Sequence, residues 1–126
     1  MGLVYAEITL QNARDVTLIP LQTTCLVDTG AYNLCIPEHV AMQLKLTKLE
    51  DREIELADGK KMLCPFVGPI IIKFENRQSF CGAMVVGNEV LLGAIPMEDM
   101  DVVVHPRTQR LIVNPQNPNF TCHKVK

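Results

Sequence analysis

The chain alternates between short apolar runs and clusters of turn-forming residues. Residues 3–10 place Val4, Ala6, Ile8 and Leu10 on one side of the backbone. A period of two over this length predicts a strand with one buried face. Similar runs recur with turn signals about every 8–12 residues, a spacing typical of an all-β sandwich or closed barrel.

Further strands are predicted over residues 16–27, 34–36, 52–56, 62–64, 70–74, 79–86, 102–104 and 110–113, with another apolar run over residues 90–94. Two prolines limit these strands, because proline donates no hydrogen bond to a ladder. Pro20 indicates a bend or an edge position in its run, and Pro65 indicates a break or bend. The dipeptide Asp58-Gly59 between two strands predicts a tight hairpin.

One helix is expected over residues 37–44. Pro37 suits the first turn of a helix, and Glu38 suits the positive end of the helix dipole. Residues 96–100 predict one helical turn at most. These patterns together predict an all-β fold with one short helix.

Composition supports one folded domain. Of the 126 residues, 48% are hydrophobic and 21% are charged, which suits a single core. The net charge is −2 and no basic cluster is present, which argues against nucleic-acid binding. No apolar stretch reaches the ~18 residues needed to span a membrane, and no signal peptide is recognisable. We expect a domain over residues 1–113 and a mobile tail over residues 114–126, which is rich in Pro, Asn and Gln.

The cysteines are odd in number and lack the spacing of a metal site or a redox motif. Four of the five lie in apolar runs; the set is Cys25, Cys35, Cys64, Cys81 and Cys122. This usage favours buried thiols in a reducing, cytoplasmic compartment. The three histidines have no ligand-like spacing either, so no metal is predicted.

The most informative stretch is the hexapeptide Leu-Val-Asp-Thr-Gly-Ala at residues 26–31. Two large apolar residues lead directly into Asp28, and Gly30 allows a tight turn. Two interpretations are open for this carboxylate at the edge of the core. It either caps the N–H groups of a turn or acts as a catalytic group on a rigid loop.

The order of three elements resembles the retropepsin-like aspartic proteases, the single-lobe relatives of the retroviral enzymes. These elements are the hexapeptide at residues 26–31, the hairpin about thirty residues later at Asp58-Gly59, and the apolar-apolar-Gly sequence at residues 91–93. The resemblance covers residues 3–113. It implies a closed acid-protease barrel whose active site lies at a homodimer interface, with the strand at residues 91–93 crossing behind the aspartate loop. The last strand, residues 110–113, would pair with its mate in the dimer.

The resemblance also implies residue roles. It assigns catalysis to Asp28, Thr29 and Gly30, and substrate binding to Ala31, Ala57, Asp58, Gly59 and Ile95. Asp28 would form a carboxylate dyad with its copy, and Thr29 would bond across to the partner loop. The hairpin would close over a peptide substrate as a flap. Neither a metal nor a cofactor is needed for this chemistry. Apolar residues are expected to line the cleft, among them Ile36, Leu56 and Ile95.

Two departures from the retroviral pattern keep other functions open. Retroviral enzymes carry an Asp and an Arg, which pair with each other, at the positions of Tyr32 and Ala94. The loss of both leaves three hypotheses. The chain is an aspartic endopeptidase, a dimeric binding module with little or no peptidase activity, or a β domain in which Asp28 only caps a turn.

Overall fold

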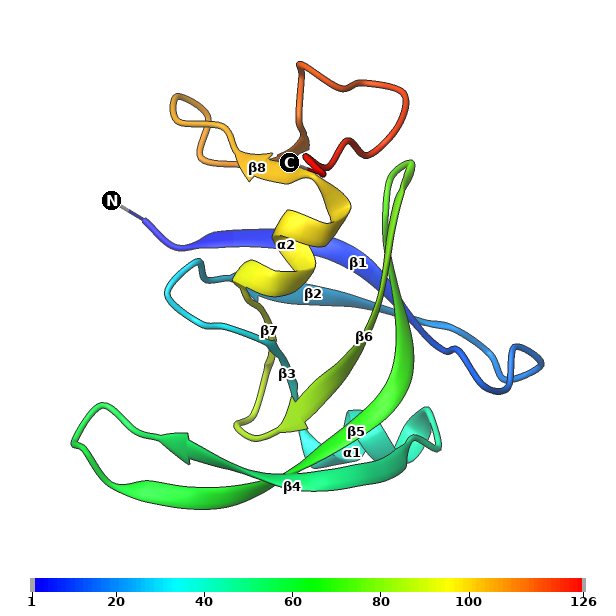
Figure 1. The fold of residues 1–126 in the computed structure, drawn as a ribbon, viewed down its shortest axis with the longest axis vertical. Helices are drawn as coiled ribbons and strands as arrows, with labels where there is room; N and C mark the ends of the chain where they lie inside the picture. Colours follow the sequence, from blue (N-terminus) through cyan, green and yellow to red (C-terminus); the bar gives the residue numbers. More distant parts are fainter. Residues whose placement is uncertain (1, 126) are drawn as a thin grey trace.

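Six strands close into a barrel in the computed structural model, which describes residues 2–125 (Figure 1). The protein is mostly β, with 48% strand and 10% helix, as the alternating pattern predicts. The strands are β1 (Val4–Asn12), β2 (Leu21–Val27), β3 (Leu34–Ile36), β4 (Thr47–Glu55), β5 (Lys61–Phe74), β6 (Arg77–Val85), β7 (Val90–Leu92), β8 (Val102–Val104) and β9 (Leu111–Val113). The helices are α1 (Glu38–Gln43) and α2 (Ala94–Met100).

The barrel follows the order β1-β2-β7-β3-β6-β5, and pairing of β5 with β1 closes it. The strand β4 adds to the outer side of β5, and β8 and β9 form a separate two-stranded sheet. Most neighbours are antiparallel, but β7 runs parallel to β2 and β3 runs parallel to β6. The strand β7 therefore lies between β2 and β3, which follow each other in the chain and are joined by the short loop at residues 28–33.

The core fills the barrel with aliphatic side chains from alternate strand positions. In β1, Ile8 and Leu10 are only 2% and 0% exposed, so the predicted buried face is confirmed. Leu34 and Ile36 of β3 are also fully buried. Each such side chain contributes about 1.5–3 kcal/mol of hydrophobic free energy relative to an exposed position.

The helix expected at residues 37–44 is confirmed as α1. Pro37 is its N-cap residue in an extended conformation, and Glu38 lies in the first turn. The prediction of at most one turn at residues 96–100 is wrong, because α2 covers seven residues. Pro96 is the third residue of α2, within the first turn, where a helix does not use the missing N–H.

Three strand predictions need correction. The strand expected at residues 52–56 is part of a longer one, because β4 covers Thr47–Glu55. The strand expected from residue 16 begins only at Leu21, because residues 13–20 form a loop that ends at Pro20. Pro65 does not break its run, since β5 continues through it. Pro65 pairs with Asp51 of β4, whereas the pairing of β5 with β6 starts one residue later. Among the described residues, Pro65 therefore has a strand neighbour on one side only, and its backbone nitrogen, which carries no hydrogen, can face the side without a neighbour.

The segment after β9 contacts the rest of the domain through polar groups. The carboxylate of Asp101 accepts hydrogen bonds from the side chains of Asn114 and Asn117 at 3.0 and 2.8 Å, and from the N–H of Cys122 at 3.1 Å. The buried Arg77 donates to the carbonyl of Asn117. These contacts attach the expected tail to the domain, and its mobility stays a prediction. Neither helix in residues 2–125 has the length and apolar character to cross a bilayer.

Candidate active site

The aspartate loop, residues 28–33, joins β2 to β3 around the end of β7. Because β7 lies between these strands, its residues reach both ends of the loop. The N–H of Asp28 donates to the carbonyl of Leu92 at 3.0 Å, which continues the β2–β7 pairing into the loop. Asp28 is therefore fixed by a strand that is distant in sequence. The strand at residues 91–93 thus pairs with both strands that flank the loop, and its role as the crossing strand of an acid protease stays a prediction.

The side chain of Asp28 is tied to its own loop by one oxygen. Its Oδ1 accepts the N–H of Gly30 at 2.9 Å, and its carbonyl accepts the N–H of Ala31 at 3.1 Å. No donor within residues 2–125 binds its Oδ2, which leaves this oxygen for a group outside the chain. Asp28 is half-buried, whereas Thr29 and Gly30 are exposed. A turn-capping aspartate also makes the Oδ1 contact, so this bond is compatible with both roles of Asp28.

Gly93 allows the end of β7 to pack directly on the loop. A β-carbon at this position would lie 2.3 Å from the carbonyl oxygen of Asn33 and 2.9 Å from that of Ala31. The first residues of α2 then bind the loop, with the N–H of Ala94 donating to Ala31 at 2.8 Å and that of Ile95 to Tyr32 at 2.9 Å. The loop is thus held by β7 on one side and by α2 on the other.

Thr29 borders two hollows in the surface. The first, of about 360 Å³, is mainly apolar and lies between α2 and β8, with Met97 and Val103 among its walls. The second, of about 340 Å³, includes Asp28 and Leu3. The exposed side of the loop is therefore flanked by two concave surfaces.

The hairpin predicted at Asp58-Gly59 is confirmed. It joins β4 to β5 through residues 56–60, and Ala57, Asp58 and Gly59 are all exposed at its tip. The N–H of Leu56 donates to Lys60 at 2.7 Å, and Gly59 adopts a φ of 84°. In Figure 1 the hairpin and the aspartate loop both project toward the left of the view. Its closure over a substrate stays a prediction.

The three apolar residues expected along the cleft differ in position. Ile36 is 0% exposed and belongs to the main core, so its assignment to the cleft is wrong. Leu56 and Ile95 are 40% and 38% exposed, at the hairpin turn and at the start of α2. Cys35, the neighbour of Ile36, is half-buried on the opposite side of β3, beside Leu91 of β7. The sequence does not reveal which side of residues 34–36 faces the core, because all three residues are apolar.

The thiols behave as buried groups where the strands cover them. All five cysteines are free. Burial raises the pKa of Cys25 to about 12 and that of Cys81 to about 11. Burial also raises the pKa of Cys35, with smaller contributions from Cys64 and Asp28.

The two departures noted in the sequence have structural counterparts. Tyr32 is 72% exposed, and Ala94 uses its backbone to bind the loop. The chain matched no family model and no curated protein. The resemblance to the retropepsin-like proteases consequently rests on the sequence motifs at residues 26–31, 58–59 and 91–93.

Proposed function

We propose that the protein is an aspartic endopeptidase that acts as a homodimer, with one Asp28 from each subunit. The observation that carries this proposal is the loop at residues 28–33. It presents a half-buried Asp-Thr-Gly carboxylate on a backbone held from two sides by Leu92 and α2. A turn cap needs no such support, whereas a catalytic group benefits from a preorganised position.

The chemistry requires two carboxylates about 3 Å apart that share one proton, because like charges at this distance do not both ionise readily. The ionised member takes a proton from a bound water, which attacks the peptide carbonyl. The protonated member donates to the carbonyl oxygen. No covalent intermediate forms. The Oδ1 of Asp28 remains bonded to Gly30, and Oδ2 meets the partner carboxylate or the water.

A single chain supplies only half of this dyad. No other aspartate stands in an Asp-Thr-Gly or Asp-Ser-Gly sequence. A second copy related by a twofold axis would bring an identical carboxylate opposite Asp28. The exposed Thr29 and the hollows beside it suit contact between two such copies. The hairpin at residues 56–60 would cover a peptide in the cleft.

The alternative is a dimeric retropepsin-like module that binds partners without cutting them. Tyr32 and Ala94 favour it, because they replace the charged pair that binds substrate backbone in the retroviral enzymes. Both functions predict a dimer. Only the first predicts hydrolysis.

Two measurements test the proposal. Sedimentation at tens of micromolar protein should give roughly twice the chain mass of 14.1 kDa. Cleavage of an unfolded protein, assayed at acidic and neutral pH, should stop when a statine-type transition-state analogue is added. A strict monomer that still cleaves would contradict the dyad. A dimer without cleavage at either pH would favour the binding module.

A further inference from the structure

One edge of β1 lacks a neighbouring strand over half of its length. The strand β2 pairs with residues 4–10 of β1, but β5 pairs only with residues 9–12. The reason is that β5 ends at Phe74, and the chain turns back into β6 after Glu75. Among the described residues, none extends the ladder beside residues 4–8 on this side. Alternate residues of this stretch therefore direct their N–H and C=O groups toward an unoccupied strand position.

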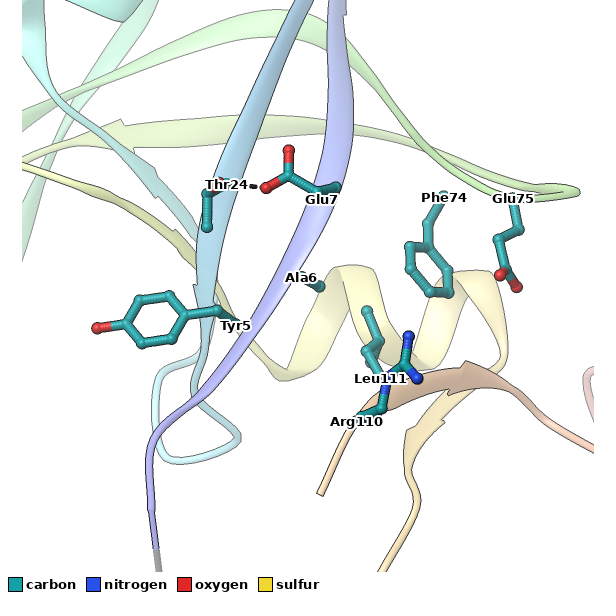
Figure 2. Close-up of a pocket in the computed structure, with 8 residues that line it drawn as sticks. All are labelled: Tyr5, Ala6, Glu7, Thr24, Phe74, Glu75, Arg110 and Leu111. Carbon is teal, nitrogen blue, oxygen red and sulfur yellow. Dashed lines mark hydrogen bonds between the residues drawn. The ribbon is translucent and has the colours of Figure 1, made fainter. Parts of the chain in front are cut away.

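A pocket of about 390 Å³ lies at this open edge (Figure 2). Its opposite wall is the start of β9, where Leu111 is 6% exposed, and β9 pairs on one side only, with β8. In Figure 2 the side chains of Phe74 and Leu111 point into the same space beside Ala6, whereas the ring of Tyr5 points away. The pocket thus has an apolar floor next to unpaired backbone.

Charged side chains form the rim of this pocket. They are Glu7 from β1, Glu75 from the β5–β6 turn and Arg110 beside β9. The carboxylate of Glu7 accepts a hydrogen bond from the hydroxyl of Thr24. Within residues 2–125, none of the three charged groups takes part in an ion pair. In Figure 2 Glu7 lies on the same side of β1 as Tyr5, whereas Glu75 and Arg110 lie on the side of Phe74 and Leu111, where their opposite charges balance. The face of β1 that carries Glu7 is therefore the acidic one.

We propose that this pocket binds an extended segment of a partner protein, which adds as a strand to the open edge of β1. An edge with unpaired backbone groups recognises extended polypeptide, since main-chain hydrogen bonds supply the affinity. The side chains of the added strand alternate between two faces. One set lies over Ala6, Phe74 and Leu111 and is apolar. The other set lies beside Glu7, its cross-strand neighbour, and is basic.

This site is separate from the proposed peptidase site. The pocket shares no residue with the aspartate loop at residues 28–33 or with the hairpin turn at residues 56–60. Binding there does not depend on the dyad. The pocket does share Arg110 and Leu111 with the strand that the resemblance expects to pair in the dimer, so a segment bound at β1 would lie beside the expected dimer contact.

The test uses three capped heptapeptides and the ¹⁵N-labelled full chain. The first peptide alternates lysine with valine, the second carries glutamate in place of lysine, and the third has a proline at the centre of the first. We expect the lysine peptide to shift the amide signals of Ala6, Glu7 and Leu111 and to bind more tightly than the other two. Glu7→Lys, at an exposed position of β1, should weaken binding of the lysine peptide about fivefold and strengthen binding of the glutamate peptide. Glu89→Lys, an equal change of charge in an exposed turn outside the pocket, should alter neither.

Three results would overturn this inference. The first is a set of shifts confined to residues 28–33 and 54–62, which would place the peptide only in the proposed catalytic cleft. The second is equal binding of the proline peptide, which would exclude pairing with β1. The third is the absence of any shift at millimolar peptide, in which case Glu7, Glu75 and Arg110 protect the edge from pairing rather than recruit a strand.

Discussion

The aspartate loop and the β4–β5 hairpin are both short reversals between strands, yet they are held in opposite ways. The loop is bound by residues far along the chain, since Asp28 donates to Leu92, and Ala94 and Ile95 donate to the loop. The hairpin turn bonds only within residues 56–60. All residues of β4 except Ile54 are exposed. The aspartate loop is thus part of the core structure, and the β4–β5 hairpin extends from it.

This contrast suits a division of roles between a rigid site and a mobile cover. Long-range contacts must break together for the loop to move, whereas the hairpin loses only local hydrogen bonds when it opens. Mobile lids are usually weakly held parts of a fold, whereas reacting groups lie on strongly held parts. The predictions below test whether these two reversals differ in function, in stability and in motion.

The largest effect is expected from Asp28→Asn. Asn has nearly the same shape and keeps an oxygen for the N–H of Gly30. It can act neither as acid nor as base, and the substitution removes both members of a symmetric dyad. Cleavage should fall by about 10³-fold or more. The change in unfolding free energy should be small, because relief of repulsion between two close carboxylates offsets any loss at the loop. Peptide hydrolysis and thermal melting of both proteins measure these outcomes.

The matched control is Asp58→Asn in the hairpin turn. Asp58 also accepts an N–H two residues ahead, from Lys60 at 2.9 Å, so the local chemistry is the same. Because Asp58 is expected to contact the substrate and not the reacting bond, kcat should persist in this variant and any change should be confined to KM. Activity that survives Asp28→Asn would remove Asp28 from the mechanism and leave it as a turn cap.

Glycine-to-alanine substitutions in the two regions should lower the free energy of unfolding by different amounts. Gly93→Ala places a β-carbon 2.3 Å from the oxygen of Asn33, so β7 or the loop must move. A clash of this kind in packed backbone costs about 1–3 kcal/mol of unfolding free energy. Gly59→Ala meets no atom within 4 Å and carries only the strain of its φ of 84°. That strain costs about 1 kcal/mol.

Denaturant unfolding of the two variants measures this difference. Gly2→Ala, which also meets no atom within 4 Å, should leave the free energy of unfolding unchanged. A Gly59→Ala variant less stable than Gly93→Ala would reverse the comparison and make the hairpin the more strongly held reversal.

Much of the fold follows from local patterns, but the sheet order does not. The alternation in β1 and the Asp58-Gly59 turn act over a few residues, so the sequence predicts them directly. The insertion of β7 between β2 and β3 depends on contacts more than fifty residues apart, which no local period encodes. The sequence also does not show that the strand continues through Pro65. Whether a proline interrupts a strand depends on which of its two sides has a neighbour.

The arrangement of the candidate site also depends on long-range contacts that local sequence patterns do not encode. Asp28 and Gly93 both stand out in the sequence as an acid and a glycine at the ends of apolar runs. Their proximity across the aspartate loop comes from the fold, and only the resemblance anticipated it. Residues 34–36 contain no polar position that marks the outer side of the strand, so the sequence does not reveal that Ile36 belongs to the core.

Hydrogen exchange should reveal the difference in motion. The amides of Asp28, Ala94 and Ile95 should exchange slowly, because each donates to a carbonyl across the loop. The amides of residues 56–60 should exchange quickly and then slow when a peptide-like inhibitor binds. Mass spectrometry of peptic fragments measures both sets in one experiment. Unchanged exchange at residues 55–63 with a bound inhibitor would contradict the assignment of the hairpin as a flap.

Thiol labelling gives a finer comparison, because two cysteines with similarly low solvent exposure report on the two regions. Cys25 lies in β2, three residues before Asp28, and is 1% exposed. Cys64 lies in β5 on the hairpin side and is 2% exposed. A reagent that attacks thiolates reaches either one only when the structure opens locally, because burial raises the pKa of both thiols. Exposed Cys122 should react first and provides the reference rate.

If the hairpin opens without the barrel, Cys64 should react before Cys25. An opening free energy lower by 1.4 kcal/mol gives a tenfold faster rate, so we expect a ratio of about ten or more. Cys122→Ser removes the fast phase, and Cys35→Ser and Cys81→Ser remove the two half-buried thiols, so that only the two slow phases remain. Raising the pH above 9 should accelerate Cys25 through unfolding as well. The unfolded thiol ionises there while the folded one, with its pKa of about 12, stays protonated, so the free energy of unfolding falls as pH rises. Equal rates for Cys25 and Cys64 near neutral pH would mean that the base of the hairpin is as firmly held as the strand that carries Asp28, and that any flap motion is limited to residues beyond Cys64.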